Sequence, residues 1–230
     1  MLEPTPPPSF NLDEARARFA ATWSTFCAAP RMLGPTPGHR QEWAAGRTRY
    51  AVWGIRVRAE AVRERASALQ GMLGPNIRKI PLEDLHITVW VAGFPTAAAL
   101  VHSDDIPEAA LEEQAAALQA HRSFRLVVGG SNSFRTAPFL EVFDLDGGLA
   151  SLRQTLGRCG PPELRFAPYQ PHITLGSAST DIPTASVRRV LSAHRELPVI
   201  ELTVRCIEQL RFDALEPRAV LQTHNMVTLR

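Results

Sequence analysis

Two stretches of the sequence share a tripeptide: LHITVWVAGFP (residues 85–95) and YQPHITLGS (residues 169–177) both contain His-Ile-Thr. Each tripeptide lies in a run rich in β-branched and other apolar residues, which predicts a strand. The pattern His-x-Ser/Thr is weak by itself, and a third example, at residues 121–123, lies at the end of a predicted helix among polar neighbours. Two identical tripeptides on two apolar strands are much harder to attribute to chance, so we interpret them as a functional signal.

Side chains alternate across a strand, so His86 and Thr88 share one face of the first strand. His172 and Thr174 share a face of the second in the same way. If the two strands lie side by side, two imidazoles and two hydroxyls surround one cleft. This set suits phosphodiester hydrolysis, which needs a base to activate water and an acid to protonate the leaving oxygen. The threonine hydroxyls can donate hydrogen bonds to the charge that builds on the phosphate.

The length and composition indicate a soluble globular protein of one domain or two small lobes: 230 residues, 45% hydrophobic and 21% charged. A net charge of +2 excludes a protein that holds long nucleic acid by charge alone. Three cysteines that lie far apart argue against a disulfide framework or a zinc site. We find neither a signal peptide nor an apolar run of the ~18 residues that a membrane span needs. The sequence therefore predicts a cytoplasmic protein with no cofactor, no metal, no membrane contact and no obligate protein partner.

The order of the predicted elements favours an α+β fold with antiparallel sheets. Residues 1–46 look like an N-terminal extension with one amphipathic helix, and residues 47–230 form the main body. We expect the apolar stripe of the extension, Leu12, Phe19 and Phe26, to pack on the body and to leave the cleft open. Helices are predicted at 11–28, 60–73, 107–121, 148–159 and 184–195, and strands at 50–57, 86–92, 124–128, 139–144, 169–175, 199–212 and 219–229.

The paired motifs resemble those of the 2H phosphoesterases, in particular the branch of the 2′-5′ RNA ligases and RNA 2′,3′-cyclic phosphodiesterases. The first motif of that branch runs from Leu-His through Thr to a Gly, and the second has Pro directly before the histidine, as here. The segment SFRTAP (residues 133–138) is similar to the aromatic and basic loop between the family's motifs. The resemblance covers about residues 47–230. Trp90 stands where the family often has Phe, a mild departure.

The resemblance implies a two-lobed fold with two antiparallel sheets and outer helices around a central cleft. It implies a metal-independent cyclic phosphodiesterase that opens 2′,3′-cyclic phosphates of RNA 3′ ends or of small cyclic nucleotides. Some members also make or reverse 2′-5′ linkages, so 2′-5′ RNA ligation is an implied second activity. His86 and His172 are the implied acid and base, and Thr88 and Thr174 are the implied phosphate ligands.

Further residues are candidates for substrate binding. Tyr169, three residues before His172, could stack on a base, although it could equally be a core or rim aromatic. Phe134 and Arg135 lie in the loop that is expected to face the cleft, where Arg135 could contact a phosphate. Arg165 is a weaker candidate near the second motif.

Two alternatives to catalysis remain open. In the first, the same cleft is a non-catalytic module that binds a nucleotide or an RNA end, which the intact set of four motif residues disfavours. In the second, the histidines satisfy hydrogen bonds in the core of a structural or interaction protein, which an open cleft holding both histidines would exclude. The sequence does not indicate which histidine is the acid and which the base.

Overall fold

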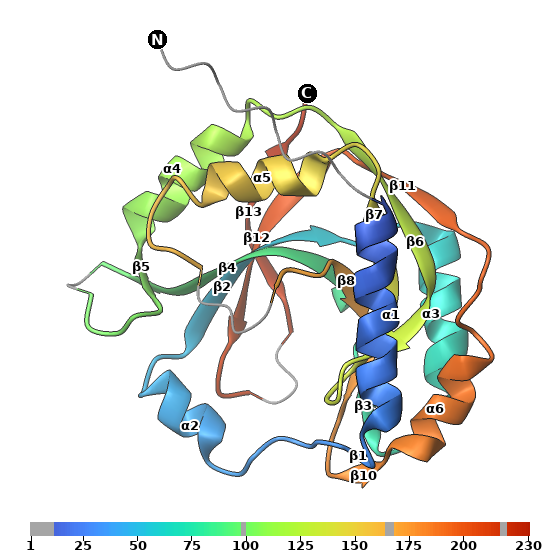
Figure 1. The fold of residues 1–230 in the computed structure, drawn as a ribbon. Coiled ribbons are helices and arrows are strands. Elements are labelled where there is room, and N and C mark those ends of the chain that lie inside the picture. Colours follow the sequence, from blue (N-terminus) through green and yellow to red (C-terminus); the bar gives the residue numbers. More distant parts are fainter. Residues whose placement is uncertain (1–11, 98–99, 164–167, 217–219) are drawn as a thin grey trace.

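The computed structural model describes residues 12–97, 100–163, 168–216 and 220–230. Most strands belong to one nine-stranded sheet (Figure 1). Its members are β2 (Arg49–Arg56), β4 (His86–Thr96), β5 (Asp105–Pro107), β6 (Phe124–Ser133), β7 (Pro138–Asp144), β8 (His172–Thr174), β11 (Ile200–Val204), β12 (Cys206–Asp213) and β13 (Gln222–Thr228). Two short antiparallel pairs lie outside it, namely β1 (Arg31–Met32) with β10 (Ile182–Pro183) and β3 (Ile77–Lys79) with β9 (Gly176–Ala178).

The large sheet consists of two antiparallel halves that meet edge to edge. One half has the order β11-β6-β7-β8 and the other the order β4-β2-β12-β13, while β5 pairs with β4 in parallel. The halves join where β8 meets β4, through the pairing of Ile87 with Ile173. Both isoleucines are fully buried. The two-lobed α+β fold expected from the sequence is therefore confirmed, with the two His-Ile-Thr strands at the seam between the halves.

Helices surround this sheet: α1 (Leu12–Ala28), α2 (His39–Ala44), α3 (Glu60–Met72), α4 (Glu108–Leu118), α5 (Gly148–Leu156) and α6 (Thr184–Ser192), with a 3₁₀ turn η1 (Leu82–Asp84). Two of them, α3 and α5, also contact the half to which they do not belong in sequence. The helix α5, which lies between β7 and β8 in the chain, contacts β4 of the other half. Arg65 of α3 donates hydrogen bonds to the carbonyls of Val128 and Gly129 in β6. The halves are thus interlocked, and most of their buried side chains form a single core.

Several predicted elements differ from the structure; the strand predicted over 169–175, for example, is limited to β8. The strand predicted over 199–212 is broken at Arg205: β11 pairs with β6 in one half, whereas β12 pairs with β2 and β13 in the other. The chain passes from one half of the sheet to the other at this residue, whose carbonyl accepts a hydrogen bond from the Leu229 amide. The connection between the strands predicted at 124–128 and 139–144 is shorter than expected, because β6 continues through a bulge as far as Ser133.

The N-terminal helix α1 packs on the body as its apolar stripe predicts. Phe19 and Phe26 are buried, and the Phe19 ring lies 5.1 Å from that of Phe143 and 6.2 Å from that of Phe139, both in β7. The Asn132 side chain donates a hydrogen bond to the Phe19 carbonyl. Figure 1 shows α1 lying across β6 and β7. The helix is therefore an integral part of the half that carries the second motif.

Removal of the Phe19 ring should destabilise the whole protein. We expect Phe19→Ala to lower the free energy of unfolding by about 3–5 kcal/mol, because it empties a buried aromatic site between α1 and β7. Urea denaturation followed by circular dichroism measures this. The matched control is Ala20→Gly on the exposed side of α1, which should cost about 1 kcal/mol. Equal losses for the two variants would show that α1 is not packed on the sheet.

Candidate active site

The two His-Ile-Thr tripeptides lie on adjacent antiparallel strands, and their register places the motif residues together. Because Ile87 is the partner of Ile173, His86 lies next to Thr174 across the seam and Thr88 lies next to His172. In each tripeptide the isoleucine is buried and the histidine and threonine are only half-buried. All four polar side chains therefore share the face opposite the core.

This register puts the two histidines at diagonal corners of a four-residue square. Directly opposed residues of an antiparallel pair are about 4.5–5.5 Å apart, and diagonal neighbours are about 7–8 Å apart. A phosphate group can lie between two imidazoles at such a spacing, with one threonine hydroxyl beside each imidazole. The arrangement is pseudo-symmetric, since each strand contributes one histidine and one threonine.

Both histidine rings are oriented by the same backbone contact. The Nδ1 atom of His86 lies 2.8 Å from the Asp84 carbonyl oxygen, and that of His172 lies 2.7 Å from the Gln170 carbonyl oxygen. A carbonyl oxygen only accepts hydrogen bonds, so each Nδ1 must carry the proton. In the neutral ring the free lone pair is then on Nε2, which can accept a proton. In the protonated ring Nε2 also carries a proton, which it can donate. Each ring is thus prepared to act as a base or as an acid through Nε2.

The neighbours of the two histidines differ in charge. In the sheet, Arg56 is opposite His86 on one side, whereas Glu141 is opposite His172 on the other. Burial lowers the pKa of His86 below its usual 6.5; the charge of Arg56 contributes to the lowering, and the hydrogen bond to the Asp84 carbonyl opposes it. Each charge also has an ion-pair partner, Asp84 at 3.1 Å for Arg56 and Arg195 at 2.5 Å for Glu141. The surroundings of His86 therefore favour the neutral imidazole.

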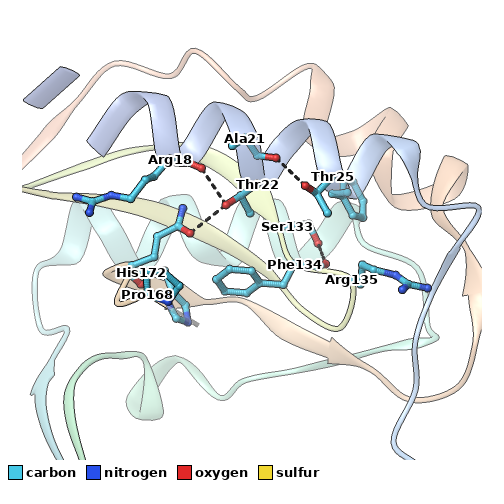
Figure 2. Close-up of a pocket in the computed structure, with 11 residues that line it drawn as sticks. Arg18, Ala21, Thr22, Thr25, Ser133, Phe134, Arg135, Pro168 and His172 are labelled. Atoms are coloured by element: carbon cyan, nitrogen blue, oxygen red, sulfur yellow. Dashed lines mark hydrogen bonds between the residues drawn. The ribbon is translucent and has the colours of Figure 1, made fainter. Parts of the chain in front are cut away.

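Phe134 and Arg135 lie at the turn between β6 and β7, and both line a cavity of about 590 Å³ that also includes His172. The Phe134 ring is 5.0 Å from the imidazole of His172, edge to face. Figure 2 shows the Phe134 ring between His172 and Arg135, while the Arg135 side chain extends away from the histidine. Phe134 is therefore a direct neighbour of the second motif, and Arg135 lies at the far end of the cavity.

The Tyr169 side chain contacts the first motif. Its hydroxyl donates a hydrogen bond to the Thr88 carbonyl at 3.0 Å, and the Arg153 guanidinium lies 4.0 Å from the centre of its ring. Arg153 also binds the Val89 carbonyl and forms an ion pair with Glu163. These contacts give Tyr169 a role in joining β4 to the segment before β8, and stacking on a base stays a prediction. Arg165 lies outside the described residues.

Sequence reasoning missed the part that α1 takes in this region. Arg18, Ala21, Thr22 and Thr25 of α1 line the cavity beside His172 (Figure 2). The helix forms one wall next to the second motif, while the expectation that it leaves the cleft between the two motifs open stays a prediction. The spacing of these residues, three and four apart, marks one helix face, but nothing in the sequence shows what that face meets.

Among the described residues, no group of three or more His, Cys, Asp or Glu side chains could hold a metal ion. No helix in the described ranges is both long and apolar enough to cross a lipid bilayer.

Comparison with known proteins shows the family and the fold of the chain. Residues 57–216 match the model of the 2′-5′ RNA ligase superfamily. No curated protein matches the sequence. Among solved structures, TT0787 of Thermus thermophilus is 17% identical with a TM-score of 0.57, covering 79% of this chain and 98% of its own.

Escherichia coli LigT has a similar fold. Its apo form is 14% identical with a TM-score of 0.54, covering 80% of this chain and 99% of its own. Its complex with 3′-AMP is 16% identical with a TM-score of 0.55, and the match covers 79% of this chain and 98% of the LigT chain. These identities show a shared fold, and the family match spans more than half of the sequence. The chain therefore belongs to the 2′-5′ RNA ligase superfamily of 2H phosphoesterases.

Proposed function

We propose that the protein is a metal-independent cyclic phosphodiesterase that opens 2′,3′-cyclic phosphates of RNA 3′ ends or of small cyclic nucleotides. The observation that supports this most strongly is the register at the seam, which places His86, Thr88, His172 and Thr174 on one face. Two imidazoles and two hydroxyls are enough for acid, base and phosphate binding. Ligation to form 2′-5′ linkages would use the same groups with a ribose hydroxyl in place of water.

In the proposed reaction one imidazole accepts a proton from water at Nε2, and the water oxygen attacks phosphorus. The other imidazole gives its Nε2 proton to the departing ribose oxygen as the P–O bond breaks, which yields a phosphomonoester and a free hydroxyl. Thr88 and Thr174 donate hydrogen bonds to the non-bridging oxygens, where negative charge increases. His86 suits the role of base, since burial lowers its pKa and keeps it neutral near pH 7.

The alternative is a module that binds the same ligands without turning them over. Binding alone requires the threonines and the shape of the cleft, but it does not require each histidine ring to hold Nδ1 against a carbonyl. The duplicated orientation of the two rings favours proton transfer. Turnover of cyclic phosphates by the purified protein, measured by separating substrate from product, distinguishes the two functions.

Substitution of the motif residues should cause large losses of turnover that do not add. We expect His86→Ala and His172→Ala each to lower kcat by about 10²–10⁴, the range for a positioned proton-transfer group. The double variant should be little worse than either single one, because the two act as a unit. Thr88→Ala and Thr174→Ala should lose about 10–10³ in kcat. Steady-state kinetics on cytidine 2′,3′-cyclic phosphate measures all of these. Full activity of either histidine variant would contradict the mechanism.

The pH dependence should show two ionisations, since one imidazole must be neutral and the other protonated. If His86 is the base, kcat/KM rises with pH as His86 loses its proton. The pKa of His86 is lowered from 6.5, so we expect the acid limb of the profile below pH 6.5. Initial rates between pH 4 and pH 9 at low substrate test this. A profile whose acid limb lies above pH 7 would show that His86 is not the base.

Chelation should leave the rate unchanged. The described residues offer no cluster of metal ligands, and the two imidazoles can perform both proton transfers. Dialysis against EDTA followed by the cyclic phosphate assay measures this, with a known zinc-dependent phosphodiesterase as the positive control. A loss of rate that Mg²⁺, Mn²⁺ or Zn²⁺ restores would contradict the proposed chemistry.

A further inference from the structure

The cavity beside His172 has two walls, which come from different parts of the chain. One wall is α1, which precedes the residues that match the superfamily, and the other consists of the β6–β7 turn and the segment that leads into β8. Of the four motif residues only His172 lines it. The cavity has about 590 Å³, within the range of ~300–1,000 Å³ typical of small-molecule sites. It therefore extends the site on one side, away from the seam.

The cavity has an aromatic surface that suits a flat ring. Phe139 packs against Phe134 with ring centres 4.4 Å apart and an angle of 33°, so it covers one face of the Phe134 ring. The ring centre of His172 lies 5.0 Å from that of Phe134, with the two rings nearly perpendicular. Phe134 also lines the cavity, and Figure 2 shows its ring opposite α1. A planar group that enters between α1 and Phe134 can pack against the part of the Phe134 ring that lines the cavity.

The charges around the cavity suit an anion attached to that ring. Arg18 and Arg135 both line it and both are exposed. Within the described ranges neither of them forms an ion pair with a carboxylate. Thr22 and Thr25 add hydroxyls on the α1 wall. A flat apolar surface with guanidinium groups nearby suits the last base of an RNA 3′ end, whose preceding phosphate can lie beside an arginine while the cyclic phosphate lies at the seam.

One residue ties α1 to the second motif. The Thr22 hydroxyl lies 3.0 Å from the side-chain oxygen of Gln170, and the backbone carbonyl of the same Gln170 holds Nδ1 of His172. The helix is thus connected to the imidazole through a single intervening residue. A nucleoside that contacts α1 is consequently adjacent to the histidine that would act on its phosphate.

From these observations we infer that α1, together with Phe134, forms a subsite for the nucleoside part of the substrate. The N-terminal extension then contributes to substrate binding as well as to stability. This inference rests on the proposed function for the identity of the substrate, a nucleoside 2′,3′-cyclic phosphate. In this arrangement α1 helps to bind the nucleoside, and the histidines at the seam carry out the proton transfers.

The test fills the cavity from the α1 side. Ala21 is exposed and lines the cavity, so Ala21→Trp introduces a bulky ring without disturbing the core. The matched control is Ala20→Trp, since Ala20 is also exposed but does not line the cavity. Both variants are compared on adenosine 2′,3′-cyclic phosphate and on glycerol 1,2-cyclic phosphate, which has the same reactive ring but no base. Equal melting temperatures show that both variants are folded.

We expect Ala21→Trp to raise KM for the adenosine substrate by about tenfold or more, the loss of one base–aromatic stacking contact, with kcat little changed. Its kcat/KM on the glycerol substrate should equal that of the unmodified protein, and Ala20→Trp should behave normally on both. Phe134→Leu should raise KM for the adenosine substrate by a larger factor than for the glycerol substrate, because it removes the stacking surface. If Ala21→Trp and Ala20→Trp have the same KM for the adenosine substrate, the inference is overturned.

A binding measurement separates this inference from the proposed function. If the protein hydrolyses neither substrate, the proposed function fails, and titration calorimetry with 3′-AMP still tests the subsite. The inference predicts that 3′-AMP binds the unmodified protein and Ala20→Trp with similar affinity and binds Ala21→Trp at least about tenfold more weakly. Equal affinity for all three proteins, or no binding to any of them, overturns it.

Discussion

One pairing between two strands determines where the candidate chemistry is located. The halves of the sheet meet where β4 and β8 lie side by side, and Ile87 faces Ile173 at that point. A shift of this register by one residue would turn one tripeptide over and bury its histidine and threonine in the core. Because both isoleucines are fully buried, such a shift would also expose apolar surface. The hydrophobic core therefore fixes the register, and the register fixes the position of the four polar side chains.

The rest of the fold holds this seam in place. Helices that belong to one half in sequence pack on the other, so the halves cannot separate without exposing a common core. The chain also passes from one half of the sheet to the other at Arg205. Close to the site, backbone carbonyls of Asp84 and Gln170 orient the two rings, and the Tyr169 hydroxyl binds the Thr88 carbonyl. The imidazoles are consequently held by main-chain atoms as well as by side-chain packing.

The part of the site that local sequence determines could be predicted. Alternation along a strand places His86 with Thr88, and the duplicated tripeptide indicates that the two strands work together. The superfamily resemblance and the α+β class are confirmed. The break at Arg205 could not be predicted, because both flanking stretches have the same β-rich pattern. The wall that α1 forms beside His172 depends on a contact between residues 148 positions apart, Thr22 and Gln170, which no local pattern encodes.

The central claim is that His86 and His172 act on one phosphate from opposite corners. The most direct measurement is nuclear magnetic resonance of protein with nitrogen-15-labelled histidine, titrated with 3′-AMP near pH 6. The account predicts that Nε2 of both His86 and His172 shifts along the same saturation curve, while both Nδ1 atoms remain protonated. It also predicts that Thr174→Ala weakens both responses together. A shift confined to one of the two histidines would contradict a shared phosphate site.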